Sequence, residues 1–168
     1  MNLDFEVRVL PGIPENYPRS LPASEVAGFI AREKADAYRE IIGQNDLVVT
    51  ADTVVVVGNE ILGKPNDAED AHRMLRLISG RTHQVVTGVC LLTADKERCF
   101  SVTTDVTFKQ LSEEEVTYYI ENYKPFDKAG SYGIQEWIGY VGVTSISGSY
   151  FNVMGLPVQR VWEEIKKL

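Results

Sequence analysis

Hydrophobic and polar positions along the chain follow two periods, and a period of two marks the predicted strands. Residues 5–10 (FEVRVL) alternate between apolar and polar side chains, as the residues of a half-exposed strand do. Residues 47–57 (LVVTADTVVVV) are nearly all apolar or β-branched, which is typical of a strand buried on both faces. Two further strand-like runs, 83–93 and 98–109, are separated by a short polar turn and predict a β-hairpin.

Helical spacing occurs in four other segments. The first helix is predicted over residues 24–42, with Ser24 as its N-cap. A second spans residues 66–80 and opens with a sequence that resembles a capping box. A clear capping box at residues 112–115 opens a third. Pro157 occupies a position that the first turn of a C-terminal helix tolerates.

The order of these elements predicts a single α/β domain spanning residues 1–168. The 168 residues are 44% apolar and 24% charged, which is ordinary for a soluble globular protein of a size that buries its own core. No internal repeat, low-complexity tract or linker divides the chain. Because both short turns and helical segments join the strands, we expect a mixed, twisted sheet with flanking helices.

Net charge restricts the kind of partner, and the lack of targeting signals and the two cysteines indicate the location of the protein. The net charge of −7 argues against a nucleic acid bound through many phosphates, although a few local cations could hold a small anion. The N-terminus has no basic n-region or apolar h-region, and no apolar run is long enough to span a membrane. We therefore predict a soluble, cytoplasmic protein that binds a small molecule, with no membrane or nucleic-acid partner. Cys90 and Cys99 lack metal-site spacing and are interpreted as buried thiols in a reducing compartment.

Asp52 departs most clearly from its surroundings. It interrupts the apolar run 47–57, where an unpaired carboxylate is costly to bury. One interpretation is a solvated acid at the end of a strand. The other, which the apolar neighbours favour, is a functional acid that binds a divalent metal or accepts a proton from water.

Lys34 and Glu33 break the pattern of the first predicted helix. Lys34 projects between Ala27 and Ile41 in the apolar arc, and Glu33 lies at the edge of that arc. A snorkelling lysine beside a surface glutamate explains both residues equally well. The functional alternative is a lysine that contacts phosphate oxygens and a glutamate that binds the metal.

Residues 58–64 (GNEILGK) have the spacing of a P-loop but not its chemistry. Position 65 is proline, so the hydroxyl that would bind magnesium is missing. The short apolar segment between the glycines is typical of a hairpin return. Lys64 is therefore either an ordinary solvated lysine or a point charge for phosphate.

The other polar and aromatic residues indicate no nucleophile. His72 and His83 share no metal-ligand spacing and are interpreted as structural, and Trp137 and Tyr140 as core or interface residues. The glycine-containing stretch 127–135 is either a tight turn beside the core or a place where backbone approaches a ligand. No Ser-His or Cys-His arrangement is present. Acids and lysines near one strand instead favour metal-assisted attack of water on a phosphate.

Six segments of the chain resemble the Maf family, which is related in fold to the inosine triphosphatases. They occur in family order: residues 31–35 (AREKA), 50–55 (TADTVV), 62–65 (LGKP), 77–89 (LISGRTHQVVTGV), 127–135 (DKAGSYGIQ) and 146–157 (ISGSYFNVMGLP). Chance does not produce so many matches in one order. The resemblance implies an enzyme that releases pyrophosphate from nucleoside triphosphates with a divalent metal, Mg²⁺ or Mn²⁺.

The resemblance also implies roles for particular residues. Asp52 matches the acid that accepts a proton from the attacking water, and it is expected to bind the metal together with Glu33. Lys34 and Lys64 match the lysines that meet the triphosphate. We expect Lys128 to bind substrate as well.

Two further positions carry the expected specificity. Thr53 and Gln135 match the positions that mark the branch acting on dTTP and UTP. A sister branch, which acts on methylated guanine and uracil nucleotides, carries a different residue where Gln135 stands. The resemblance therefore favours dTTP and UTP, and modified pyrimidine nucleotides are further candidates.

The chain departs from the family pattern at its start. Family members open with a strand and a Ser-x-Ser-Pro-Arg-Arg loop before the segment that matches residues 5–7, whereas here Met1 lies just ahead of it. A late start codon or a shortened form would explain this. Without that strand, part of the sheet would be exposed, and homodimerisation is one way to cover it. The alternative to an active pyrophosphatase is a non-catalytic Maf-like protein that binds nucleotide or acts in cell-division control.

Overall fold

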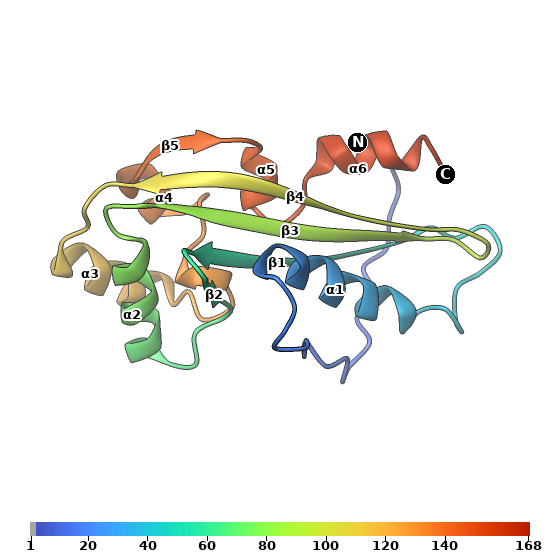
Figure 1. Ribbon diagram of the computed structural model, residues 1–168, viewed down its shortest axis with the longest axis horizontal. Helices are drawn as coiled ribbons and strands as arrows, with labels where there is room; N and C mark the ends of the chain where they lie inside the picture. Colours follow the sequence, from blue (N-terminus) through green and yellow to red (C-terminus); the bar gives the residue numbers. More distant parts are fainter. Residues whose placement is uncertain (1–2) are drawn as a thin grey trace.

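The centre of the fold is a five-stranded sheet in the order β2-β1-β3-β4-β5 (Figure 1). The computed structural model describes residues 3–168. The strands are β1 (Val48–Val57), β2 (Glu60–Leu62), β3 (Thr82–Leu92), β4 (Glu97–Phe108) and β5 (Val143–Ser147). Each pair of neighbouring strands is antiparallel.

The predicted α/β class is confirmed, but the sheet of residues 3–168 is antiparallel and not mixed. Helix α2 (Ala68–Ile78) does connect two strands that run in the same direction, β2 and β3, as a helical crossover should. However, β1 lies between these two strands and is antiparallel to both. The crossover therefore creates no parallel pair of neighbours.

Helices cover both faces of the sheet. Besides α2, they are α1 (Ala23–Asp36), α3 (Glu113–Tyr123), α4 (Trp137–Gly142), α5 (Tyr150–Val153) and α6 (Val158–Ile165), with a short 3-10 turn η1 (Ala129–Ser131). Figure 1 shows α2, α3 and α4 gathered towards one end of the long strands β3 and β4, and α6 towards the other. The capping box that opens α3 and the start of α6 after Pro157 confirm two sequence predictions.

Alternate residues of β1 divide the core between the two faces. Val54 and Val56 pack in a cluster with residues of α1, and Val55 and Val57 pack in a cluster with residues of α2 and α3. This confirms a strand buried on both faces, as its continuous β-branched sequence predicted. Helix α1 lies very close to the sheet at Gly88, where a Cβ would overlap the helix backbone.

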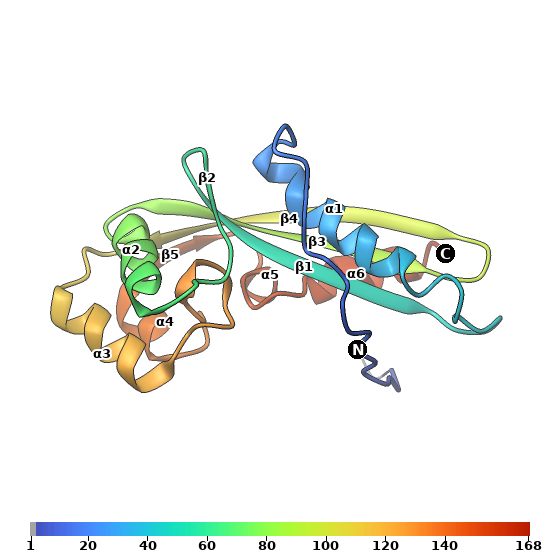
Figure 2. The same cartoon turned by 90° about the horizontal axis from the view of Figure 1, so that it is seen from below.

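Residues 5–10 do not form the predicted strand. They have no regular secondary structure, and the side chains of Phe5, Val7 and Val9 are largely exposed. Figure 2 shows this segment as an irregular trace outside the sheet. A strand needs a neighbour that accepts and donates its backbone hydrogen bonds, and within residues 3–168 this segment has none.

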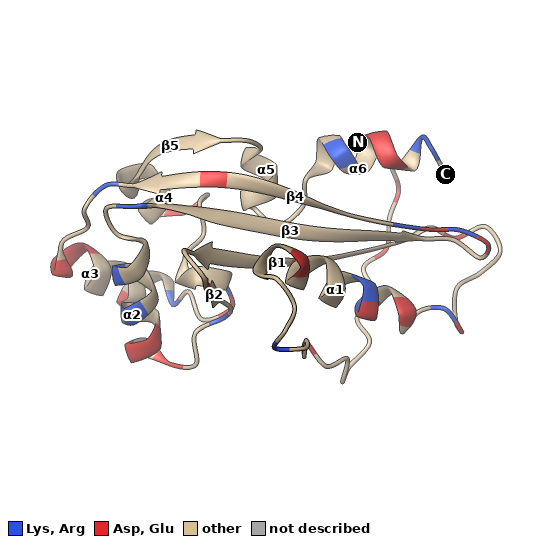
Figure 3. Ribbon diagram, in the orientation of Figure 1, with Lys and Arg blue, Asp and Glu red and all other residues tan. Residues whose placement is uncertain are grey.

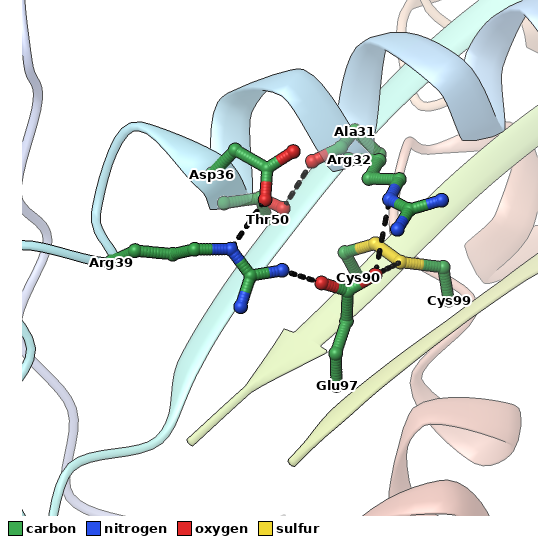
Figure 4. Close-up of a disulfide and its surroundings, with 8 residues drawn as sticks. All are labelled: Ala31, Arg32, Asp36, Arg39, Thr50, Cys90, Glu97 and Cys99. Carbon is green, nitrogen blue, oxygen red and sulfur yellow. Dashed lines mark hydrogen bonds and ion pairs between the residues drawn. A yellow bond between two sulfur atoms is a disulfide. The ribbon is translucent and has the colours of Figure 1, made fainter. Parts of the chain in front are cut away.

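The two cysteines are not free thiols, which corrects the interpretation from composition. Cys90 of β3 and Cys99 of β4 face each other in the register of the hairpin and are joined by a disulfide (Figure 4). Cys90 is fully buried, whereas Cys99 is exposed. The carboxylate of the nearby Glu97 forms ion pairs with Arg32 and Arg39. The disulfide depends on the strand register, which the number and spacing of cysteines do not reveal.

Charged residues of both signs are interleaved over the ribbon (Figure 3). They alternate along α1 and α6 and at the turn that joins β3 to β4. Of the helices in residues 3–168, none has the length and apolar character needed to cross a membrane.

Candidate active site

A cleft of about 450 Å³ lies along the edge of β1. Strand β2 pairs only with residues 55–57, so the edge formed by residues 48–54 has no partner strand in the described part of the chain. The residues that line the cleft and carry polar side chains are Glu15, Tyr17, Asp52, Thr53, Lys64, Asp127, Lys128, Tyr132 and Gln135. The open edge therefore gives access to both faces of β1.

Asp52 is a paired, mostly buried acid in this cleft. Its side chain is 13% exposed, and Nζ of Lys34 donates to its Oδ1 over 2.8 Å. Burial raises the pKa of Asp52, the hydrogen bond and charge of Lys34 oppose that shift, and the charge of Glu15 adds to it, so that the pKa is raised overall. The alternative of a solvated acid at a strand end does not describe this position.

Lys34 extends from α1 and joins two carboxylates. The same Nζ that bonds Asp52 lies 2.8 Å from Oε1 of Glu15. Burial alone would lower the pKa of Lys34, but hydrogen bonds to Asp52 and Glu15 outweigh burial and raise it. Lys34 is therefore a fixed cation between two acids and not a snorkelling surface lysine.

Lys64 lies on the other side of Glu15. It follows β2, confirming that residues 58–64 form a hairpin return and not a phosphate loop. Its Nζ is 3.6 Å from Oε2 of Glu15, and its side chain is 57% exposed. The hydrogen bond from Lys34 is the main cause of a lowered pKa at Glu15. Of the two lysines, Lys64 is the one free to move towards a ligand.

The structure brings Asp52, Lys34 and Lys64 together but places Glu33 elsewhere. Glu33 is exposed on α1 and is not among the residues that line the cleft. Adjacent helical residues point in different directions, so Glu33 and Lys34 do not share a face. A metal role for Glu33 stays a prediction, and the cleft offers Glu15 as the second acid. Sequence reasoning missed Glu15 because a proline-rich irregular stretch has no period from which an acid would stand out.

The loop formed by residues 127–135 closes another side of the cleft. Nζ of Lys128 lies 3.2 Å from Oδ1 of Asp127 and 3.3 Å from Oε1 of Glu136. Burial opposes the charge of Lys128, but these bonds raise its pKa overall. Gly130 adopts a φ of 68° and its amide donates to the carbonyl of Gly63 over 3.0 Å. This bond attaches the loop to the end of β2.

A buried pair of rings supports the same loop. Nε2 of His83 is 2.7 Å from the hydroxyl of Tyr132, whose ring lines the cleft. Burial lowers the pKa of His83 to about 4, so the imidazole is neutral. The structural role predicted for His83 is confirmed. Trp137 is partly buried against the main core, as predicted, while Gln135 is exposed at the rim of the cleft.

Thr53 follows Asp52 and faces the other side of the sheet, because successive strand residues alternate. Its Oγ1 is 2.9 Å from Oγ1 of Thr87, which in turn donates to the backbone carbonyl of Asn152 over 3.0 Å. Thr87 and Asn152 are fully buried. No sequence pattern indicates this chain of contacts, because a threonine in a buried strand resembles any other β-branched residue.

The donors in the cleft fit a divalent cation. Lys34 bonds Oδ1 of Asp52 and Oε1 of Glu15, and Oε2 of Glu15 lies 3.6 Å from Nζ of the exposed Lys64. Carboxylate oxygens are the protein ligands that Mg²⁺ and Mn²⁺ prefer. Lys64 and Lys128 line the same cleft, and Lys34 pairs with two of the acids that line it.

This fold and this cleft define an α/β protein whose site suits a small polyanion accompanied by a divalent cation. The chain belongs to the Maf family: the family model described as Maf-like protein matches residues 1–168.

The chain is also similar over its length to proteins named dTTP/UTP pyrophosphatase. One from Phocaeicola vulgatus is 57% identical over 168 residues, which are 100% of this chain and 87% of that relative. One from Bacteroides fragilis is 54% identical with the same coverage. One from Porphyromonas gingivalis is 52% identical over 99% of this chain and 84% of the relative.

Proposed function

We propose that this chain hydrolyses dTTP and UTP, each to its nucleoside monophosphate and inorganic pyrophosphate. The observation that carries the proposal is Asp52, an acid that is 13% exposed within an apolar strand and opens on a cleft lined with lysines. A buried carboxylate held by a lysine beside a cleft is typical of a functional site. The names of the relatives support dTTP and UTP as the nucleotides.

In the proposed reaction, water adds to a phosphorus of the anhydride between the α- and β-phosphates. The anhydride P–O bond breaks, and Asp52 takes the proton of the water. Lys34 holds the Asp52 carboxylate in place and favours its ionised form. Lys64 places a mobile positive charge next to the phosphates.

A divalent metal, Mg²⁺ or Mn²⁺, is part of the proposal. We infer that Asp52 and Glu15 hold it, since both line the cleft and each has a carboxylate oxygen that Lys34 does not bond. When bound, the metal neutralises phosphate charge and lowers the pKa of water. Thr53, Gln135 and Lys128 would then contact the remainder of the nucleotide.

Pyrophosphate release from dTTP and UTP, with Mg²⁺ and with Mn²⁺, tests the proposal. Replacing Asp52 by Asn removes the proton acceptor but keeps the shape, and we expect kcat/KM to fall about 10³-fold. Asp105→Asn is the matched control, because Asp105 lies on β4 and bonds Gln84 outside the cleft. If the wild-type chain cleaves neither nucleotide with either metal, the proposal is wrong. Binding of UTP without turnover would favour the non-catalytic alternative.

The cytoplasmic location and the homodimer stay predictions. A second copy would have two surfaces to cover, the open edge of β1 and the exposed side chains of Phe5, Val7 and Val9. Light scattering of the purified chain measures its mass in solution and tests the homodimer.

A further inference from the structure

The hydroxyl of Thr53 is the end of a hydrogen-bonded chain that leads from the cleft into the interior. Oγ1 of Thr53 lies 2.9 Å from Oγ1 of Thr87, and Oγ1 of Thr87 lies 3.0 Å from the carbonyl oxygen of Asn152. The amide of Gly155 donates to that same carbonyl over 3.0 Å. Thr87 and Asn152 are both 0% exposed, so water does not compete for these bonds.

The chemistry of the three groups fixes the direction of the chain. A carbonyl oxygen only accepts, and a hydroxyl has a single hydrogen to donate. Thr87 therefore gives its hydrogen to Asn152. The short contact between the two hydroxyls then requires Thr53 to donate to Thr87, because the opposite arrangement would bring two lone pairs together at Asn152. Thr53 is left with lone pairs and no hydrogen to offer the cleft.

The surroundings of Thr53 suit the base end of a nucleotide better than its phosphates. The cluster formed by Asp52, Lys34 and Glu15 is on the α1 side of β1. Gly155 lies next to Thr53, since a Cβ added at Gly155 would be 3.6 Å from Oγ1 of Thr53, and the uncharged Val153 and Met154 line the same cleft. Thr53 is only partly buried and lines the cleft, so its hydroxyl can meet an uncharged planar ligand there.

We propose that Thr87 orients the Thr53 hydroxyl as a hydrogen-bond acceptor, which selects a nucleobase that donates from its ring nitrogen. Uracil and thymine carry a hydrogen at N3, whereas N3 of cytosine is an acceptor and would meet the lone pairs of Thr53. Thr87 is thus a positioning residue that acts through Thr53. The inference rests on the proposed function, because it concerns how the same cleft distinguishes pyrimidine triphosphates.

Two methylated nucleotides test the contact in the wild-type protein. 3-Methyl-UTP has a methyl group in place of the N3 hydrogen. 5-Methyl-UTP keeps that hydrogen and carries its methyl group at position 5, where thymine also has one. We expect kcat/KM for 3-methyl-UTP to be at least about tenfold below that for UTP, and 5-methyl-UTP to behave like UTP. Equal loss with both analogues would overturn the contact.

The Thr87→Val variant tests the positioning role. Valine has the shape of threonine but offers no acceptor, so the Thr53 hydroxyl can turn and donate to cytosine. We expect the ratio of kcat/KM for UTP to that for CTP to fall about tenfold, by the loss of roughly one hydrogen bond. Thr87→Ser keeps the hydroxyl and should keep the ratio. A purely structural defect would lower both activities together and leave the ratio unchanged.

The outcomes separate this inference from the proposed function. If the wild-type chain hydrolyses no pyrimidine triphosphate, the proposed function fails. If it hydrolyses UTP, but Thr87→Val folds and retains both the UTP-to-CTP ratio and the discrimination against 3-methyl-UTP, only the role of Thr87 fails. Should Thr87→Val not fold, the two methylated nucleotides on the wild-type protein decide whether Thr53 accepts from N3.

Discussion

The two faces of β1 meet at one cleft but carry opposite kinds of polar chemistry. On the α1 face, Asp52 is held by a lysine that also bonds Glu15. On the other face, Thr53 continues into a buried hydroxyl and a backbone carbonyl, with no formal charge. In both cases the polar group at the cleft has a hydrogen-bond partner deeper in the protein: Lys34 for Asp52 and Thr87 for Thr53. Buried polar groups generally require such partners.

The difference lies in what each arrangement controls. Ion pairs set protonation states, and their strength depends on burial and on neighbouring charge. A chain of hydroxyls sets only the direction in which hydrogens point, and it is insensitive to pH near neutrality. The charged face, where Asp52 meets Lys34 and Glu15, therefore suits the reacting phosphates. The uncharged Thr53–Thr87 chain lies on the face that also packs against the loop 127–135, and it suits recognition of an uncharged base.

Removing the central cation of the charged face should have the largest effect. For Lys34→Met we expect kcat/KM to fall about 10²- to 10³-fold, because the Asp52 carboxylate loses its hydrogen-bond donor and the phosphates lose a charge. Lys166→Met, at the residue that follows α6, is the control, since Nζ of Lys166 lies over the ring of Trp162 and Lys166 is not among the residues that line the cleft. Loss of activity no greater than in the control would break the assignment of this face to catalysis.

The pH dependence of Lys34→Met gives the same test a second readout. Asp52 must be ionised to accept a proton, so activity falls as pH drops through its pKa. Burial already raises that pKa above the usual range for aspartate, and Lys34 opposes the rise. Without Lys34 the acid limb of the pH–rate profile should therefore move to higher pH. An unchanged limb would mean that another group controls it.

The next largest effect is expected on metal dependence, where Glu15→Gln and Glu33→Gln should differ. We expect Glu15→Gln to need at least about tenfold more Mg²⁺ or Mn²⁺ for half-maximal activity, because an amide is a weaker metal ligand than a carboxylate. Glu33→Gln should stay within about twofold of wild type, since exposed substitutions change little. Titration of activity with each metal measures both. A larger effect at Glu33 would restore the role that the family resemblance implies for it.

A smaller effect, on KM, is expected from the ion pair that positions Lys128 in the loop 127–135. Glu136 contacts Nζ of Lys128 at 3.3 Å and also accepts from the hydroxyl of Tyr119 over 2.5 Å. Glu136→Gln keeps a partner for Tyr119 but removes the charge that positions Lys128. Partly exposed ion pairs contribute little, so we expect KM for UTP to change by no more than about fivefold with kcat unchanged. A fall in kcat would place Lys128 at the reacting phosphates.

The fold was predictable where local sequence and tertiary contacts agree. The buried run of β1, the β3–β4 hairpin and the Ser112 capping box follow from patterns that need no distant partner. Residues 5–10 carry an equally clear alternating pattern, yet they form no strand because an alternating pattern does not supply a neighbour. Strand β5 and helix α4 were missed because a glycine-rich stretch has no period.

The site was predictable where a residue conflicts with its surroundings. Asp52 stands out among valines, and Lys34 stands out on an apolar helical face. Glu15 and Thr87 do not stand out: one lies in an irregular segment, and the other looks like any β-branched strand residue. Their contribution depends on contacts with residues distant in sequence, at separations that no local pattern encodes.

The smallest effect on activity is expected at the disulfide, which lies away from both faces of the cleft. Cys90 and Cys99 do not line the cleft, and α1 is fixed by its own apolar cluster with β1 and by the hydrogen bond from Thr50 to Ala31. For Cys99→Ser we therefore expect kcat/KM within about twofold of wild type.

The disulfide closes a short loop between residues already paired in a hairpin, with a sequence separation of 9, so its loss should cost at most about 3 kcal/mol of unfolding free energy. Urea unfolding with and without reductant measures that cost. A large loss of activity in a folded Cys99→Ser variant would mean that the position of Lys34 depends on the ion pairs of Glu97 with Arg32 of α1 and with Arg39 beyond it. The hairpin turn between β3 and β4 would then influence the charged face.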